Sequence, residues 1–368
     1  MDSHDLDRRA HRGAGPASAE TDELLELADL RVAELAEVAE QGDGATLPTR
    51  RRWWVLPLRI TASLAMLAVL VWRAPDFDLA ELVPRWSATT ATWLGVALVL
   101  TLLGIVLSAL RWQQVLHAIG LPARLRSLVP LYFAGQFVSN VLPTTIGGDV
   151  LRVSRLSREN GDTPDTFASV VLERLTGWLV LPLITLFGLL VNPGLRQLGR
   201  ASTLAFAIAA ATLACLAAVL VAAEHPRLGG RFRARQGWQR FVGAVHVGVD
   251  RLRRRPRAAA GVIGAGFVYQ LVLCLAALAA AEALGLSSVG LTPLLAFFPA
   301  VLIAQVLPIG ISGLGIREGA FVIFLTPLGV PPEQAVALGL VLYLLNVAVS
   351  LLGAPAFAIG GRPRHAVA

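Results

Sequence analysis

The hydrophobic pattern of the chain is a series of long apolar runs. Six of them are long enough to cross about 30 Å of hydrocarbon as helices, and they occupy residues 53–71, 93–110, 166–190, 202–223, 258–284 and 335–359. None alternates between polar and apolar positions, as the strands of a transmembrane β-barrel do. The pattern therefore predicts an all-α integral membrane protein.

Two further apolar segments, residues 128–146 and 294–328, are interrupted by a proline and turn polar at the depth of the membrane. A shift of 165 residues places VLPTTIGGDVLR of residues 141–152 over VLPIGISGLGIR of residues 306–317, and 6 of the 12 positions are identical. Broken apolar segments in two corresponding positions are expected of a transporter-like fold with internal repeats. We therefore expect two copies of one helical unit.

The positions of the arginines predict how these segments are oriented. Arginines precede the first span at residues 50–52, follow the second span at Arg111, and number ten between residues 224 and 257. Basic loops favour the cytoplasmic side, and all of these loops reach it if residues 128–146 form a re-entrant hairpin. A full crossing by residues 128–146, which the pattern leaves open, would place the ten arginines outside.

With a second re-entrant hairpin at residues 294–328, the chain is predicted to have six full transmembrane helices and two re-entrant helical hairpins. Three crossings separate the two hairpins, so the two copies have opposite orientations, which is an inverted-topology repeat. Both termini are then cytoplasmic. The predicted location is the cytoplasmic membrane.

Composition supports this class and divides the chain into three parts. Hydrophobic residues make up 55% of the 368 residues, charged residues make up 15%, and the mean hydropathy is +0.64, which is far more apolar than a soluble domain of this size. Twelve of the 25 acidic residues precede Ala45, but only four of the 32 basic residues do. We predict an acidic, partly helical or disordered cytoplasmic tail at residues 1–52, a membrane domain at 53–361 and a short basic tail at 362–368.

The composition also argues against several alternatives. Arginines concentrated between apolar spans are a topology signal, so no nucleic acid partner is expected. Cys215 and Cys274 lie in separate apolar runs, which favours small core residues over a disulfide or a metal pair. The chain does not begin with a basic segment followed by an apolar one, so no cleavable signal is expected. A protein partner of the acidic tail stays an open interpretation.

The interrupted segments require special backbone conformations. Pro143 and Pro308 lack a hydrogen-bond donor and would end the incoming helices. Glycine permits tight turns and close approach to a ligand, and four glycines follow the two prolines: Gly147, Gly148, Gly313 and Gly315. Irregular backbone in a membrane is tolerated where protein or a water-filled cavity satisfies its polar groups. We therefore predict that both hinges border a polar cavity.

Charged residues beside the hinges predict an anion site. We expect a helix to begin at Asp149, whose carboxylate would cap the first turn, with Arg152 one turn later and Arg317 as its counterpart in the second copy. Helix N-termini carry partial positive charge, and arginine binds phosphate in a bidentate manner. A lipid phosphate is the expected anion. Because charges inside membrane segments are costly and usually border a pathway, Glu318 is included among the predicted substrate-binding residues.

Other polar residues have both a structural and a functional interpretation. Arg155 and Arg158 fit the wet face of an interfacial helix. Glu173 and Arg174 fit either a pair near the membrane interface or a cavity-facing pair that binds substrate or carries a proton, and both are kept as candidates. Asn140 is a candidate by its position, although polar residues inside spans more often bond between helices.

Four motifs together are similar to those of a known family. They are Arg111-Trp112, N-x-L-P-x-x-x-G-G-D-x-x-R at residues 140–152, Glu173-Arg174 followed by Gly177, and L-P-x-x-x-S-G-L-G-x-R-E-G at residues 307–319. With these motifs the chain resembles the transmembrane flippase domain of the lysylphosphatidylglycerol synthetase family, over roughly residues 53–361.

The resemblance implies lipid translocation rather than lipid synthesis. In two-domain members of that family, a soluble C-terminal domain attaches an amino acid to phosphatidylglycerol, and the membrane domain moves the product outward. The present chain ends at Ala368, directly after its last predicted span, so we expect no aminoacyltransferase domain. The headgroup stays unassigned, and no cofactor is implied.

Three classes of function are compatible with these observations. The preferred one is a flippase-like transporter of an anionic, aminoacylated or polyprenyl-linked lipid, which is not an enzyme. The second is a membrane glycosyltransferase with a lipid-phosphate sugar donor, because Asp76 and Asp78 form a D-x-D pair in the first outward loop, where it could bind a divalent cation. The third is a scaffold that presents the acidic tail to a partner.

Common hydrolase, metal and nucleotide motifs are missing from the sequence. No catalytic, metal or cofactor residue is therefore assigned. Without a nucleotide-binding motif, transport would be downhill or driven by an ion gradient.

Overall fold

The computed structural model describes residues 86–141, 147–224, 238–306 and 313–359, together with residues 61, 65, 66 and 68. The chain divides into two compact units, of which Arg50–Phe357 contains the described helices apart from the last two residues of α14. The other unit consists of Met1–Thr49 and Ala358–Ala368. The predicted acidic tail, the prolines of both hinges and the D-x-D pair lie outside the described residues.

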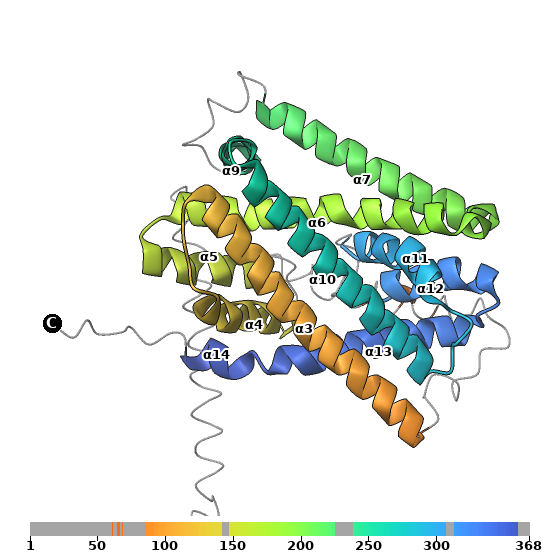
Figure 1. Ribbon diagram of the computed structural model, residues 1–368. Helices are drawn as coiled ribbons and strands as arrows, with labels where there is room; N and C mark the ends of the chain where they lie inside the picture. Colours follow the sequence, from red (N-terminus) through yellow and green to blue (C-terminus); the bar gives the residue numbers. More distant parts are fainter. Residues whose placement is uncertain are drawn as a thin grey trace, which may run out of the picture. The chain divides into compact units, whose positions relative to one another are not determined.

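The described part of the chain is built from helices (Figure 1). The first copy of the predicted repeat and the segment after it contain α3 (Ala88–Ile119), α4 (Leu125–Val141), α5 (Gly147–Asn160), α6 (Thr163–Val191), η3 (Pro193–Gln197), α7 (Arg200–Glu224) and α9 (Trp238–Arg253). The second copy contains α10 (Pro256–Ala283), α11 (Leu291–Ala304), α12 (Ile316–Leu325), η5 (Thr326–Leu328), α13 (Pro332–Leu351) and α14 (Ala354–Ile359).

Five of the six predicted spans coincide with helices that are long and apolar enough to cross a membrane. These are α3, α6, α7, α10 and the segment Pro332–Ile359. Their outer faces carry exposed apolar side chains, such as Val99, Val221 and Leu344, and broad exposed apolar surfaces mark contact with lipid or protein. The chain is therefore an all-α integral membrane protein. The remaining predicted span, residues 53–71, is described only at four helical positions.

Two boundaries differ from the sequence prediction. The span that was predicted to end at Leu110 continues as α3 to Ile119, because the first helix-ending residue is Gly120, which has a left-handed conformation with φ of 89°. Arg111 therefore lies inside a helix and not in a loop. Residues 224–257, predicted to be a basic loop, contain the helix α9. Val245 and Val249, one turn apart on α9, pack against neighbouring helices.

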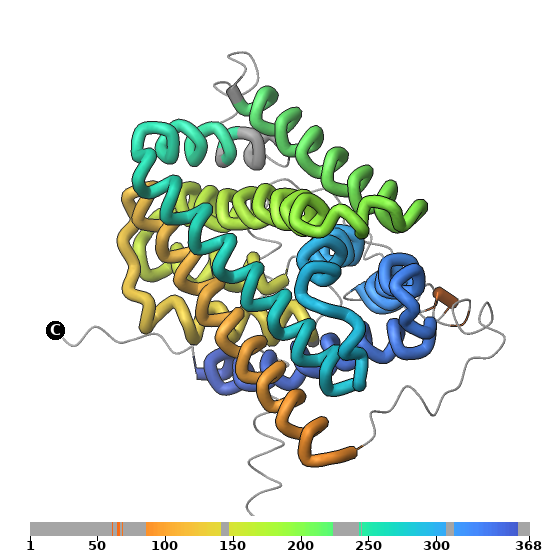
Figure 2. Tube along the Cα trace, turned by 45° about the vertical axis from the view of Figure 1, so that its right-hand side comes forward, coloured from red at the N-terminus to blue at the C-terminus, as the bar shows by residue number. Residues whose placement is uncertain are grey.

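Four consecutive helices recur at the spacing found in the sequence. Adding 165 to the bounds of α3 gives residues 253–284, and α10 occupies Pro256–Ala283; in the same way α4, α5 and α6 correspond to α11, α12 and α13. Helices α3 and α10 pack along each other in opposite directions (Figures 1 and 2). Arg255, before the start of α10, donates to the carbonyl of His117 near the end of α3, and Gly104, further from that end, contacts Leu273.

The two copies also contact each other through equivalent glycines. Gly188, near the end of α6, lies against the backbone of Leu295 and Ala296 in α11. Gly353, which follows it by 165 residues, lies against the backbone of Phe133 in α4. Neither glycine leaves room for a Cβ atom. Each of these glycines thus lies against the backbone of a helix from the other half of the sequence.

Stacked aromatic rings pack between α11 and α12 of the second copy. Between α11 and α12, Phe297 stacks on Phe324 at 5.1 Å between ring centroids and Phe298 stacks on Phe321 at 5.9 Å. These rings belong to the largest buried cluster of the described residues, which also includes parts of α6, α10 and α13. The corresponding helices of the first copy, α4 and α5, border the charged residues described next.

Candidate functional site

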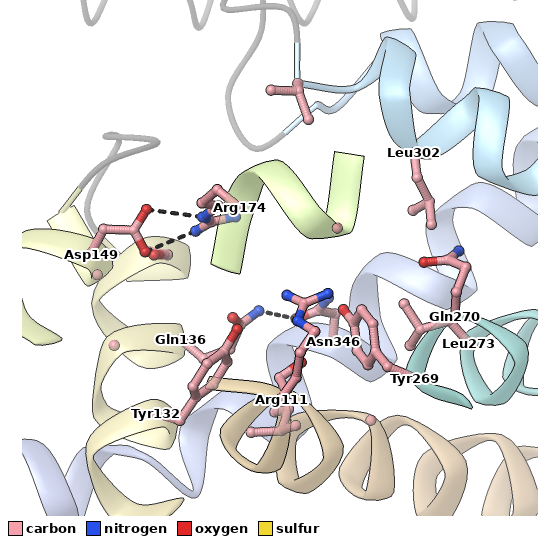
Figure 3. Close-up of a pocket in the computed structure, with 18 of the residues that line it drawn as sticks. Arg111, Tyr132, Gln136, Asp149, Arg174, Tyr269, Gln270, Leu273, Leu302 and Asn346 are labelled. Atoms are coloured by element: carbon pink, nitrogen blue, oxygen red, sulfur yellow. Dashed lines mark hydrogen bonds and ion pairs between the residues drawn. The ribbon is translucent and has the colours of Figure 1, made fainter. Parts of the chain in front are cut away.

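A cavity of about 290 Å³ lies where the two copies meet. Helices α3, α4, α5, α6, α10 and α13 and the C-terminal end of α11 contribute to its walls. Figure 3 shows Asp149 and Arg174 on one side of the cavity and Gln270 and Leu302 on the other. The cavity therefore has a charged side from the first copy, and an opposite side from the second copy.

Glu173 anchors the charged side. Its carboxylate is fully buried on α6 and accepts hydrogen bonds from Arg111 on α3 at 2.8 Å and from Arg152 on α5 at 2.7 Å. The hydroxyl of Tyr132, on α4, donates to the same carboxylate at 2.9 Å. Charge-assisted bonds of this kind are about twice as strong as neutral ones. Four helices that are separate in the sequence thus meet at one carboxylate.

Asp149 extends this arrangement to Arg174, which is more exposed than Arg152. Its carboxylate accepts from Arg152 at 2.5 Å and from Arg174, through Nε at 3.0 Å and Nη2 at 2.9 Å. The Arg174 side chain is 52% exposed, whereas that of Arg152 is 3% exposed. The result is an ion chain in the order Arg111, Glu173, Arg152, Asp149, Arg174. We call it the arginine chain; it contains three positive and two negative charges, so it carries a net charge of +1.

Aromatic rings hold the two buried guanidinium groups in place. The Arg152 guanidinium lies 4.4 Å from the centroid of the Tyr132 ring and 4.9 Å from that of Trp112, and the Arg111 guanidinium lies 5.0 Å from that of Tyr269. Cation–π contacts stabilise a cation that has lost its water. The Trp112 indole is itself fixed by a 3.0 Å hydrogen bond to the Ser169 hydroxyl.

Glycine at position 148 allows the first hinge helix to approach its neighbour. A Cβ atom on Gly148 would overlap the backbone oxygen of Gly135 and the hydroxyl of Ser139 on α4. This close contact of α5 with α4 brings Asp149 and Arg152 to the cavity. The sequence predicts that this helix begins at Asp149, but it begins two residues earlier, at Gly147. The Asp149 carboxylate binds two arginines.

The other side of the cavity carries amides. Asn346 Oδ1, on α13, accepts from Gln136 at 2.9 Å and from Asn140 at 3.2 Å, both on α4. Gln270 on α10 and Gln305 after α11 also line the cavity. Among the described residues, Gln270 Nε2 is buried without a hydrogen-bond partner, and so is Nε of Arg111. Buried polar groups are nearly always bonded, so each unpaired donor requires an explanation.

The structure brings four of the predicted site residues together: Asp149, Arg152, Glu173 and Arg174. Asn140 donates a hydrogen bond to Asn346 on the other side of the cavity. The second hinge is built differently. Arg317 donates to Glu318 at 2.7 Å, and Glu318 accepts from the Gly315 N–H at 2.6 Å at the start of α12. Both side chains are buried, but neither lines the cavity.

The glycines of the second hinge have the conformation expected of turn residues. Gly313 has φ of 75° and Gly315 has φ of 87°, a region that side chains other than glycine rarely adopt. Arg317 lies 5.2 Å from the Tyr343 ring centroid and stays within the second copy. The structure therefore places the two hinge arginines in separate environments.

The other two arginines of α5 lie in different environments. Arg158 is exposed at the end of the helix. Arg155 is half-buried and donates to the backbone carbonyls of Ala356 and Phe357.

Sequence reasoning did not identify two residues of the charged side, Arg111 and Tyr132. The sequence predicts a loop position for Arg111 because it follows an apolar run that is already long enough to span the membrane. The absence of glycine or proline between it and Gly120 is the signal that could have placed it inside the helix. No periodic pattern distinguishes Tyr132 from its apolar neighbours, since only the packing of α4 on α6 directs its hydroxyl to Glu173.

A helical membrane fold with an internal cavity bordered by paired arginines and carboxylates defines a polytopic membrane protein with a charged internal cavity. Within this class, the chain belongs to the family described as lysylphosphatidylglycerol synthase TM region, which matches residues 59–353. The match includes every residue of the arginine chain and both hinges. A comparison with curated proteins found no match.

Proposed function

We propose that this protein is a flippase-like transporter that moves a lipid with an anionic headgroup through the cavity between the two copies. The observation that carries the proposal is the arginine chain. Charged groups inside a membrane protein are costly and mark transport pathways, and this chain has one more arginine than carboxylates. The family description, which names the membrane region of a lipid-modifying enzyme, supports a lipid as the transported molecule.

The arrangement of the arginine chain suits reversible binding of a phosphate. The Asp149 carboxylate accepts hydrogen bonds from Nη2 of Arg152 and from both Nε and Nη2 of Arg174. A headgroup phosphate offers oxygen acceptors of the same kind. A phosphate that displaces Asp149 exchanges one anion for another and leaves no arginine unpaired. Glu173 keeps Arg111 and Arg152 oriented during this exchange.

We further propose that the two copies form an inverted-topology repeat, with six full crossings and two re-entrant hairpins, in the cytoplasmic membrane with both termini cytoplasmic. The equal spacing of four helices, the opposite directions of α3 and α10, and the reciprocal contacts of Gly188 and Gly353 support it. Residues 53–361 then form the transporter, with the acidic and basic tails outside it.

The topology is tested by single cysteines at exposed positions near the end of α5 and directly after α12. In a background without native cysteines, Glu159→Cys and Thr326→Cys should react with a membrane-impermeant maleimide from opposite sides of the membrane. Reaction of both from the same side would contradict the inverted repeat.

The transport proposal is tested by movement of a fluorescent phosphatidylglycerol in proteoliposomes, measured by dithionite quenching. Arg174→Gln and Arg152→Lys should each slow translocation about tenfold or more, because the first removes a charge and the second removes bidentate binding. Arg158→Gln, which changes an exposed arginine of the same helix, is the matched control. Wild-type rates in both cavity variants, with the folded protein verified by size-exclusion chromatography, would refute transport through this cavity.

Substitution of the acid pair distinguishes a glycosyltransferase from a flippase. A transferase that depends on Asp76 and Asp78 should lose activity in the double Asp76→Asn, Asp78→Asn variant. For a flippase, the same double variant should translocate lipid at the wild-type rate. Loss of translocation in this variant would count against the cavity as the sole functional site.

A further inference from the structure

We propose that Arg111 forms an enclosed phosphate position in the cavity, separate from the exposed position at Arg174 where the phosphate exchanges with Asp149. This inference rests on the proposed function and deepens it, because it names the residue that receives the charged group of the lipid. A headgroup with or without an ammonium group can place its phosphate there. The bonds, burial and surroundings of the Arg111 guanidinium support this assignment.

The three arginines of the arginine chain differ in how fully they are bonded. Arg152 donates to both carboxylates of the chain, through Nη1 to Glu173 and through Nη2 to Asp149. Arg174 donates to Asp149 through both Nε and Nη2. Among the described residues, Arg111 has one such bond, from Nη2 to Glu173, and its Nε is buried without a hydrogen-bond partner. Buried donors are nearly always bonded, so this N–H group is available for an acceptor from the ligand.

The charge of Arg111 is poorly screened by water. The two end members of the arginine chain, Arg111 and Arg174, each share one carboxylate with Arg152. The Arg174 side chain is 52% exposed, whereas that of Arg111 is 8% exposed. Charges interact more strongly in a poorly solvated site than in water. The excess positive charge of the chain therefore attracts an anion more strongly at Arg111 than at Arg174.

Two glycines make room for the Arg111 side chain between α6 and α10. A Cβ atom on Gly177 of α6 would lie 3.1 Å from Arg111 Nη1, and one on Gly266 of α10 would lie 3.8 Å from Arg111 Cδ. The guanidinium also lies 5.0 Å from the centroid of the Tyr269 ring on α10. In Figure 3, Arg111 lies between Tyr132 and Tyr269. The guanidinium is thus held where α3 and α6 of the first copy face α10 of the second copy, so it can contact a headgroup that lies between the copies.

The cavity continues from Arg111 along one face of α3. Ser108 and Thr101 line the cavity with Arg111. They precede Arg111 by three and ten residues, which places all three side chains on the same side of the helix. A phosphate that leaves the exposed position at Arg174 therefore meets Arg111 at the beginning of a wall that carries hydroxyl groups.

The test compares the binding of three probes to the purified full-length protein in detergent, measured by native mass spectrometry. The probes are short-chain phosphatidylglycerol, the same lipid with its phosphate methylated to an uncharged triester, and glycerophosphoglycerol without acyl chains. The affinity ratio of the charged to the uncharged lipid reports contacts with the phosphate charge, because a loss of folded protein affects both lipids alike. For the wild type, we expect a ratio of about ten or more.

Two variants assign this ratio to Arg111. Arg111→Lys keeps a positive charge beside Glu173 but lacks the planar fork of donors, and it should lower the ratio about tenfold. Gly177→Ala places a methyl group against Nη1 without changing any charge, and it should lower the ratio roughly threefold, since a displaced donor makes a weaker hydrogen bond. Gly264→Ala, at an exposed position of α10 with open space around it, is the matched control and should leave the ratio unchanged.

The outcomes separate this inference from the proposed function. A ratio that falls in Arg174→Gln but is unchanged in Arg111→Lys, or in Gly177→Ala if Arg111→Lys does not fold, would overturn the enclosed position and leave anionic lipid binding intact. Equal affinities of the charged and uncharged lipids for the wild type would overturn both proposals, as would binding of no probe. Equal affinity for glycerophosphoglycerol and the charged lipid would make the ligand a soluble phosphate ester and also overturn both.

Discussion

Replacing Glu173 by glutamine should destabilise the protein by about 3–5 kcal/mol, the usual cost of removing one partner of a buried ion pair. The substitution keeps the shape of the side chain and removes its charge. Arg152 retains Asp149 as a partner, whereas Arg111 retains, among the described residues, its contact with the Tyr269 ring. The glutamine amide also turns donors toward arginines that are themselves donors.

The magnitude can be worked from the contacts. Glu173 accepts charged bonds from Arg111 at 2.8 Å and Arg152 at 2.7 Å, in addition to the bond from Tyr132. Hydrogen bonds to charged groups contribute about 1.5–3 kcal/mol each, against about 1 kcal/mol for neutral ones. Losing both charged bonds outright costs about 3–6 kcal/mol, and keeping each as a neutral bond costs about 1–4 kcal/mol, so the expected loss of about 3–5 kcal/mol lies within the range that these contacts allow.

The assay is reversible unfolding in mixed micelles with increasing dodecyl sulfate, followed by tryptophan fluorescence. Glu159→Gln, an exposed glutamate at the end of α5, should leave the midpoint unchanged within error. Adding Arg111→Met to Glu173→Gln should restore about 1–3 kcal/mol, because removal of the unpaired charge removes its burial penalty. A loss below about 1 kcal/mol for Glu173→Gln, or strict additivity in the double variant, would refute the account of the arginine chain.

Three further substitutions test the packing around the site in the same unfolding assay. Gly148→Ala should cost about 1–3 kcal/mol through overlap with α4, whereas Gly95→Ala, with open space around it, should not destabilise; equal effects would contradict the close contact. Tyr132→Phe should cost about 1 kcal/mol by removing the hydroxyl bond to Glu173 while retaining the ring under Arg152, and an unchanged midpoint would show that this bond is not formed. Gly315→Ala should cost about 1–2 kcal/mol through strain at φ of 87°, so a stabilising effect would rule out the left-handed turn.

The fold class and the order of helices could be predicted from the sequence. An apolar run that is long enough to cross the hydrocarbon core as a helix indicates a transmembrane helix. Five of the six predicted spans are found as such helices. The 165-residue spacing of the two motifs also matches the spacing of α3 and α10. Local rules were less informative at boundaries, where Gly120 rather than the length of the apolar run ends α3.

The sequence by itself determined which residues carry charge inside the apolar segments, and thus named Arg152, Glu173 and Arg174 as candidates. Only the tertiary structure decided their partners. Arg152 and Arg317 occupy equivalent positions in the repeat, yet Arg152 reaches Glu173 on another helix, and Arg317 turns to the adjacent Glu318. The physical reason is that local patterns report burial and helix periodicity, whereas pairing of buried charges depends on which helices pack together, and that is set by contacts between residues far apart in the chain.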